Sequence, residues 1–254
     1  MTAPDETGPV DEDRVRREQA EMASMIVHEV RNPIASIRGL ASTGAQLYDK
    51  LSDAERLEFF ELIDHEARRL GRMAEEISTA MKLDAGVLTS EPRDEPLAEV
   101  VREGAEAIGH GGHPVSLELD EGIRGTVDRG RLHELVGHLV ENAVKFSPPV
   151  GPIEVRLRAE DGTALIEVLD SGPGIPPERR EEAFGRFVRF RPRGYEDVPG
   201  AGLGLHISRG IAAAHGGTIS VEDRPSGGTM LRVTLPLVTV PDQTPGTDPG
   251  EAIP

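Results

Sequence analysis

The sequence predicts an α+β protein, in which a helical hairpin precedes a domain of helices and strands. Residues 11–86 carry apolar stripes with helical spacing, whereas residues 96–237 mix such stripes with alternating, strand-like segments. A short stretch, 87–95, is predicted to link the two parts. The ends, 1–10 and 238–254, are polar and rich in Pro, Gly or acidic residues, and we expect both to be disordered.

The hairpin is predicted to consist of two long helices. The first runs from about Asp11 to Tyr48, and the second follows Ser52, which can cap it together with Glu55 three residues later. The second helix repeats apolar residues at steps of three and four, namely Phe60, Ile63, Ala67, Leu70, Ala74, Ile77 and Met81. Such a seam is typical of coiled coils. Because one hairpin buries only one side of itself, we expect two copies to pair as a four-helix bundle in a homodimer.

The second domain is predicted to alternate between helices and strands. The elements expected in order are a helix at 97–108, strands at 115–119 and 125–127, a helix ending at Phe146, strands at 153–158 and 164–169, a helix at 204–215, and a hairpin of 218–222 with 229–235. This order favours a mostly antiparallel sheet with helices on one face.

Composition excludes several classes of function. With 45 acidic and 28 basic residues the net charge is −17, which argues against a nucleic-acid partner. There is no cysteine, so disulfides and thiolate metal sites are excluded. No apolar run approaches the roughly 20 residues that span a bilayer, and the acidic N-terminus is unlike a signal peptide. We therefore expect a cytoplasmic chain without a membrane segment, either whole or the cytoplasmic part of a larger protein.

Two glycine-rich segments suggest a nucleotide site. The run Asp170-Ser-Gly172-Pro-Gly174 follows a strand, where a carboxylate can accept a hydrogen bond from an amine such as that of adenine. The run Gly200–Gly204 opens a helix, whose N–H groups can hold phosphate. Neither run is a P-loop. In a chain with 29 glycines, each alone is more often a simple turn.

Asn142 and Lys145 lie three residues apart and therefore share one helix face. An amide oxygen suits Mg²⁺, and an ammonium group can hold a phosphate. Without further evidence the two residues would be an ordinary solvated pair.

The order of these motifs is more informative than any one of them. His28-Glu-Val-Arg-Asn-Pro33 resembles the phosphoacceptor box of sensor histidine kinases. The other matching motifs are Glu141–Pro148, similar to the N box; Asp170–Gly174 and Gly200–Gly204, similar to the two glycine boxes; and Phe184–Phe187, similar to the F box. The resemblance covers about residues 15–236, nearly everything outside the tails.

The resemblance implies the catalytic core of a two-component histidine kinase, with an α/β sandwich ATP-binding domain of the Bergerat type. Its substrate would be ATP with Mg²⁺, and its partner the receiver domain of a response regulator. His28 would take the phosphoryl group and pass it to a regulator aspartate, because neutral imidazole is nucleophilic near pH 7. Glu29 would act as general base. Asn32 would orient the water that dephosphorylates the regulator, so a phosphatase activity is expected as well.

The resemblance also assigns a nucleotide site. Asp170, with Gly172 and Gly174, would read adenine, while Asn142 would bind Mg²⁺ and Lys145 would contact phosphate. Gly202, Leu203 and Gly204 would surround the phosphates. Arg186 and Arg189 fall in or beside the expected ATP lid, where they would neutralise triphosphate charge.

One position departs from the family pattern, because His138 stands where another Asn is usual. The segment 133–138 also mimics a zinc-protease motif, but its two histidines are five residues apart rather than four, and metalloprotease function is discounted. Two alternatives stay open at this level. One is an ATPase or serine kinase with the same nucleotide-binding fold, which would lack the His-Glu hairpin. The other is a dimeric scaffold, biased toward phosphatase action, that binds ATP poorly.

Overall fold

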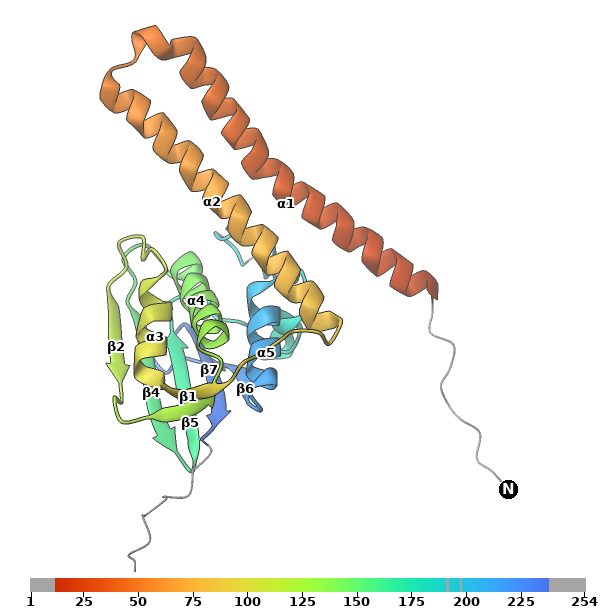
Figure 1. Ribbon diagram of the computed structural model, residues 1–254, viewed down its shortest axis with the longest axis vertical. Helices are drawn as coiled ribbons and strands as arrows, with labels where there is room; N and C mark the ends of the chain where they lie inside the picture. Colours follow the sequence, from red (N-terminus) through yellow and green to blue (C-terminus); the bar gives the residue numbers. More distant parts are fainter. Residues whose placement is uncertain (1–11, 191, 197, 238–254) are drawn as a thin grey trace, which may run out of the picture.

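The computed structural model describes residues 12–190, 192–196 and 198–237 (Figure 1). Side chains of the first helix are described from Ser24 onward, Met25 excepted. The two tails predicted to be disordered, 1–10 and 238–254, lie outside the described residues.

The hairpin consists of α1 (Glu12–Leu47), a 3₁₀ turn η1 (Tyr48–Lys50) and α2 (Asp53–Asp84). The predicted cap of α2 is confirmed as a capping box. Ser52 Oγ accepts from the Glu55 N–H at 3.3 Å, and the Ser52 N–H donates to the Glu55 carboxylate at 2.8 Å. These bonds satisfy N–H groups that the start of a helix leaves unpaired. α1 continues through Pro33.

Large apolar side chains remain exposed along the hairpin. Phe60 and Met81 of the predicted seam are 64% and 65% exposed. Other exposed apolar residues of the hairpin are Val27, Ile34, Leu57 and Leu62. Several exposed apolar residues along one pair of helices are typical of a protein contact. One hairpin therefore leaves its apolar stripe uncovered.

The second domain is built on a five-stranded sheet with the strand order β2-β4-β5-β7-β6. The elements are β1 (Arg93–Pro96), α3 (Leu97–Glu106), β2 (Val115–Leu119), β3 (Arg124–Val127), α4 (Arg129–Phe146), β4 (Ile153–Glu160), β5 (Thr163–Leu169), η2 (Pro177–Arg179), η3 (Glu182–Phe184), α5 (Gly204–Ala214), β6 (Thr218–Asp223) and β7 (Thr229–Pro236). All neighbouring pairs are antiparallel except β2 and β4, which are parallel.

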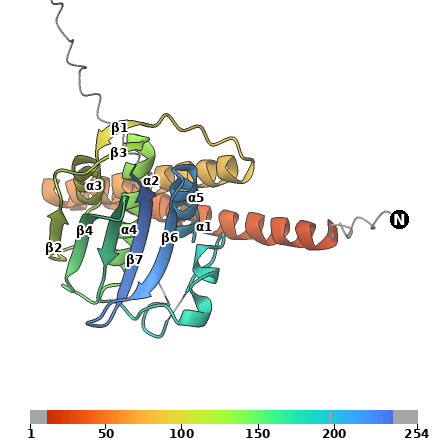
Figure 2. The same cartoon turned by 90° about the horizontal axis from the view of Figure 1, so that it is seen from below.

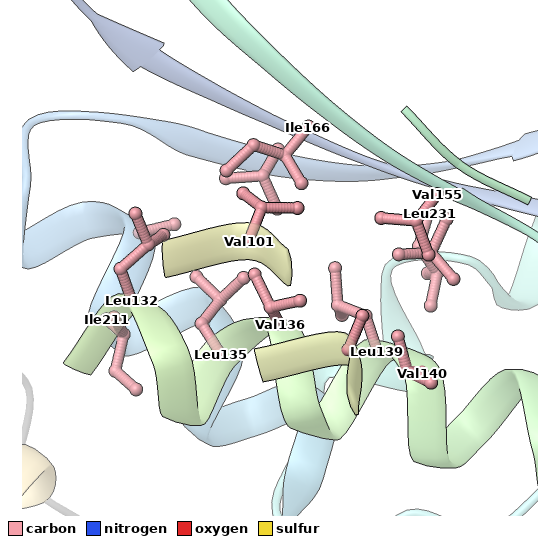
Figure 3. Close-up of a cluster of buried hydrophobic side chains, with 14 of the residues drawn as sticks. Val101, Leu132, Leu135, Val136, Leu139, Val140, Val155, Ile166, Ile211 and Leu231 are labelled. Carbon is pink, nitrogen blue, oxygen red and sulfur yellow. The ribbon is translucent and has the colours of Figure 1, made fainter. Parts of the chain in front are cut away.

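Helices α3, α4 and α5 cover the sheet face that is turned toward the hairpin (Figure 2). The strands place every second residue on this face, so Val155, Ile166 and Leu231 point toward the helices (Figure 3). They meet a row of fully buried residues on α4, namely Leu132, Leu135, Val136, Leu139 and Val140. The predicted α+β sandwich is therefore confirmed.

The opposite sheet face carries several ion pairs between neighbouring strands. Glu167 of β5 is only 1% exposed, yet its carboxylate accepts from Arg158 at 2.9 Å and from Arg232 at 2.8 Å. A buried carboxylate is tolerated when it is paired and hydrogen-bonded in this way. Along β4, apolar residues alternate with charged ones, which produces one face for the core and one charged face, whereas β5, after its first residue, is apolar on both faces except at Glu167.

Two features differ from the sequence-based expectation. Residues 93–95, assigned to the linker, belong to β1, which pairs antiparallel with β3. Its residues Arg93-Asp-Glu-Pro are polar and give no apolar alternation, so the pairing with β3 was not predictable from the pattern. The segment before α5 also contains the short helices η2 and η3, where only a loop was expected.

The hairpin packs on the second domain through the C-terminal half of α2 (Figure 1). Ala80 belongs to the main core, and Leu83 lies so close to Gly210 of α5 that a Cβ at Gly210 would come within 2.5 Å of it. Asp84 adds an ion pair to Arg186 at 2.7 Å and approaches His206 of α5 at 3.3 Å. The end of α2 is therefore part of the same packed unit as α5.

The crossing of α3 and α4 provides a stability test. A Cβ at Gly104 would lie 2.9 Å from the His133 carbonyl oxygen and from Val136 Cβ, whereas a Cβ at Gly137 would meet nothing closer than 3.7 Å. We expect Gly104→Ala to lower the free energy of unfolding by about 1–3 kcal/mol through overpacking. Gly137→Ala, the matched control, should leave it unchanged or raise it by up to about 1 kcal/mol. Urea unfolding followed by circular dichroism measures the free energy of unfolding of both variants. Equal effects of the two substitutions would contradict the close approach of α3 and α4 at Gly104.

Candidate functional site

A cavity of about 330 Å³ lies between α4, α2 and the segment that joins β5 to α5. Residues from six parts of the chain line it, one of them the long loop between η3 and α5. Among them are Met73 and Glu76 from α2; His138, Glu141, Asn142 and Lys145 from α4; Asp170, Gly174 and Ile175 after β5; Arg189 and Tyr195 from the long loop; Gly200 to Leu205 at the start of α5; and Thr229 from β7.

Asp170 is the buried carboxylate at the base of this cavity, at the end of β5. It is 5% exposed, and its Oδ1 accepts from the N–H of Gly172 at 2.7 Å and of Thr229 at 3.1 Å. Burial raises the pKa of Asp170 above its ordinary value, although the two N–H groups act in the opposite direction. The side chain is thus fixed in orientation while it lines a mostly apolar pocket.

Glycines shape two walls of the cavity. Gly202 has a φ of 71°, and a Cβ there would lie 2.6 Å from the Val188 carbonyl oxygen. Gly174 has a φ of 75°. Both positions lie in the left-handed region that favours glycine. Gly202 also brings the backbone of the long loop against the start of α5, where the first N–H groups of a helix are available to an anion.

The face of α4 that meets the cavity is polar. Lys145 Nζ lies 3.0 Å from Glu141 Oε1, one helical turn away, and Asn142 lies between them in sequence. The opposite face of α4 is buried against the sheet, as Figure 3 shows. Because 3.6 residues make a turn, this burial fixes Asn142 and Lys145 toward the cavity.

The loop after η3 joins the cavity to the hairpin. Arg189 lines the cavity and donates from Nη1 to Glu29 Oε1 of α1 at 2.9 Å, while its Nη2 contacts the Val198 carbonyl. Arg186 does not line the cavity, since its side chain is paired with Asp84 at the end of α2. Two arginines three residues apart thus hold two different segments of the hairpin.

The turn of α1 that follows Val27 carries the predicted phosphoacceptor residues. His28 and Asn32 are exposed, whereas Glu29 is 7% exposed and Pro33 is buried. His28 was expected to face solvent because it lies off the apolar seam, and it does. Through the Glu29–Arg189 ion pair this turn is anchored to the loop that borders the cavity.

The structure brings most of the predicted nucleotide residues together. Those that line the cavity are Asn142, Lys145, Asp170, Gly174, Arg189, Gly202, Leu203 and Gly204. Gly172 does not line it but donates to Asp170. Their roles toward a nucleotide and a metal ion stay predictions.

Sequence reasoning missed other cavity residues. Thr229 binds Asp170 through its N–H, and the run Gly227-Gly228-Thr229 was the available clue. Tyr195 lies with its ring centroid 6.1 Å from that of Phe146, at the end of α4. Met73 and Glu76 come from the hairpin, and no local pattern indicates that α2 closes a cavity of the second domain.

Two family profiles match the chain. Residues 18–86 match the His Kinase A (phospho-acceptor) domain, and residues 127–239 match the histidine kinase-, DNA gyrase B- and HSP90-like ATPase domain. Fold and site thus define a protein with a phosphoacceptor hairpin and a nucleotide-binding domain of the ATPase type.

Curated relatives agree with this class. The histidine-protein kinase/phosphatase MprB of Mycobacterium ulcerans is 32% identical over 237 residues, 89% of this chain and 46% of that protein. The sensor histidine kinase TmoS of Ectopseudomonas mendocina is 31% identical over 86% of this chain and 23% of that protein. The chain therefore spans about half the length of the MprB relatives it matches.

Solved structures are similar as well. A structure of the mycobacterial sensor histidine kinase MprB is 32% identical, covers 58% of this chain and 97% of that chain, and has a TM-score of 0.51. The histidine kinase ThkA, in complex with the response regulator protein TrrA, is 27% identical with a TM-score of 0.60 over 91% of this chain and 68% of that chain. The chain belongs to the sensor histidine kinase family. No helix within the described residues is long and apolar enough to cross a membrane.

The buried carboxylate gives a test of the nucleotide site. We expect Asp170→Asn to weaken ADP binding by about ten- to a hundredfold, because a charged hydrogen bond contributes roughly 1.5–3 kcal/mol. Asp161→Asn, in the exposed turn between β4 and β5, is the matched control and should bind as the unsubstituted protein does. Titration calorimetry measures both affinities. Equal affinities for ADP in the two variants would show that Asp170 is not part of the nucleotide site.

Proposed function

We propose that this chain is the core of an ATP-dependent protein-histidine kinase that phosphorylates itself on His28 and passes the phosphoryl group to an aspartate of a response-regulator receiver domain. One observation carries the proposal. Arg189, which borders the cavity of the ATPase-type domain, is bound to Glu29, the residue next to the exposed His28. The predicted donor site and the predicted acceptor therefore belong to one connected surface.

The residues present fit ATP as the substrate. The buried Asp170 carboxylate can accept from the exocyclic amine of adenine, and the N–H groups at the start of α5 can hold phosphate oxygens. Lys145 and Arg189 add positive charge at the cavity wall. The Asn142 amide oxygen is a suitable hard ligand for Mg²⁺, which when bound supplies charge neutralisation of the triphosphate.

The proposed transfer step involves His28 and Glu29 of the phosphoacceptor turn and the γ-phosphate of the nucleotide. An imidazole nitrogen of His28 attacks the γ-phosphorus of ATP, the bond from that phosphorus to the β–γ bridging oxygen breaks, and ADP leaves. The proton of the attacking imidazole passes to the Glu29 carboxylate. In the arrangement described, Glu29 is engaged by Arg189. We infer that this is a resting arrangement. The Arg189 guanidinium stays paired with the Glu29 carboxylate until the triphosphate competes for the guanidinium.

The same turn suits regulator dephosphorylation. Asn32 lies one helical turn after His28 and is exposed. An amide can orient water toward an acyl phosphate without deprotonating it. The kinase/phosphatase name of the MprB relatives and the regulator in the ThkA complex support both activities for this chain.

A homodimer completes the proposal. The uncovered apolar residues of the hairpin, such as Phe60, Leu62 and Met81, would become buried when two hairpins form a four-helix bundle. In this proposal residues 11–86 form the dimerisation and phosphotransfer hairpin, and 96–237 form the ATP-binding domain. Residues 87–95 form the linker, whose last residues join the second domain through the pairing of β1 with β3.

The phosphoacceptor assignment is tested with γ-labelled ATP and Mg²⁺. The unsubstituted protein should acquire a label that is labile to acid and stable to alkali, and His28→Gln should acquire none. His133→Gln, on α4 and outside the cavity lining, is the matched control and should be labelled normally. Phosphate release without labelling would instead indicate an ATPase, and no turnover at all would indicate a scaffold.

The phosphatase assignment depends on Asn32. We expect Asn32→Ala to retain autophosphorylation and to lose roughly a hundredfold in the rate of regulator dephosphorylation, as expected when a water loses its orientation. Ser36→Ala, one turn further along the exposed face, is the control. The measurement follows loss of label from a phosphorylated receiver domain. An unchanged rate in Asn32→Ala would refute the assignment.

A further inference from the structure

A cluster of three potential metal ligands lies where α2 meets α4. Glu76 comes from α2, and His138 and Glu141 come from α4. One ligand atom from each of the three residues lies within 4.8 Å of the other two. All three residues line the side of the cavity that the hairpin closes. The cluster therefore joins two parts of the chain that are separated by about sixty residues of sequence.

One ring nitrogen of His138 has no hydrogen-bond partner. Its side chain is 11% exposed, and its Nε2 is buried without a hydrogen-bond partner. A buried polar atom without a partner costs about 1–3 kcal/mol and calls for a physical explanation. The Oε1 atom of Glu134 lies 4.0 Å from Nε2, and this distance is too long for a hydrogen bond. A cation would satisfy this nitrogen.

The donor set of the cluster suits a divalent cation, because it combines one imidazole with two carboxyl groups. Burial raises the pKa of Glu76 to about 7, so a cation bound there near neutral pH displaces a proton. Lys145 offsets part of the negative charge through its ion pair with Glu141 Oε1. A second carboxylate, Glu76, still faces the same space.

We propose that Glu76, His138 and Glu141 form a binding site for a divalent transition-metal ion of the zinc type. The site is distinct from the Mg²⁺ role proposed for Asn142. Mg²⁺ prefers six oxygen ligands and keeps several waters, whereas one imidazole with two carboxylates is a donor set that Zn²⁺ accepts. Zn²⁺ bonds of about 2.0–2.2 Å require ligand atoms roughly 3.4 Å apart. Because the three atoms lie within 4.8 Å of one another, the cluster must contract by up to about 1.4 Å.

The ligands of this site belong to different parts of the fold. Glu76 is on the phosphoacceptor hairpin, and the other two ligands are on the nucleotide-binding domain. The complete site exists only while α2 and α4 are docked as described. A bound ion would therefore hold the two domains together, by the same linkage through which any ligand stabilises the state that binds it. This inference does not depend on kinase activity.

Titration calorimetry with ZnCl₂ on the nucleotide-free chain tests the site. We expect Glu76→Gln and His138→Asn each to weaken one site per chain by at least tenfold, and the double variant to lose it. Glu75→Gln, the exposed neighbour on α2, is the matched control and should bind as the unsubstituted chain does. Circular dichroism of each variant verifies folding, and if His138→Asn misfolds, Glu76→Gln alone decides. Absence of Zn²⁺ binding, or equal binding by the unsubstituted chain and Glu76→Gln, overturns the proposal.

A second measurement tests the link between the domains. The chain has no cysteine, so spin labels can be attached at Ser78→Cys on α2 and Ser116→Cys on β2, both exposed positions. Labelled chains are diluted into unlabelled protein to exclude distances between chains. Zn²⁺ should narrow the distance distribution between the labels, and Glu76→Gln should abolish this narrowing. An unchanged distribution in the presence of bound Zn²⁺ would show that the ion does not bridge the domains.

Discussion

Burial of one face of α4 against the sheet determines where the chemistry of this protein lies. Leu132, Leu135 and Leu139 are fully buried, and the helical period then leaves 138, 141, 142 and 145 on the remaining surface. The sheet determines the position of the other wall. Asp170 directly follows β5, and β7 begins at Thr229, whose N–H donates to the Asp170 carboxylate. The cavity between them is therefore a product of core packing. A change in the core would move both walls.

The contact between α2 and the nucleotide-binding domain adds a second layer of organisation. Leu83 packs at Gly210, Asp84 binds Arg186, and Glu29 of α1 binds Arg189. The apolar contact between Leu83 and α5 fixes the end of α2 on the second domain. The two ion pairs instead involve the loop residues Arg186 and Arg189, which can exchange partners. The Asp84–Arg186 pair is partly exposed, and ion pairs of this kind contribute little to stability. This pair is thus suited to a contact that must be made and released.

Local rules predicted the parts of the fold that depend on local physics. The Ser52–Glu55 capping box, the C-terminal end of α4 and the strands β4 and β5 follow from caps and periodicity within a few residues. Motif order pointed to most of the polar residues and glycines that line the cavity, whereas Arg186 binds the hairpin instead. β1 was missed because its polar residues are ordered by pairing with β3, some thirty residues away. The α2 lining of the cavity is likewise a contact at long sequence distance, which no pattern within α2 encodes.

The position of Tyr195 near Phe146 has a practical consequence. The chain has no tryptophan and only two tyrosines, so its intrinsic near-ultraviolet emission comes from Tyr195 and Tyr48. Tyr48 lies at the hairpin turn beneath the Arg56 guanidinium, far along the chain from the cavity. Tyr195 lines the cavity itself. The unlabelled protein therefore carries an optical reporter in the loop over its own binding site, and replacement of Tyr48 would leave that reporter alone.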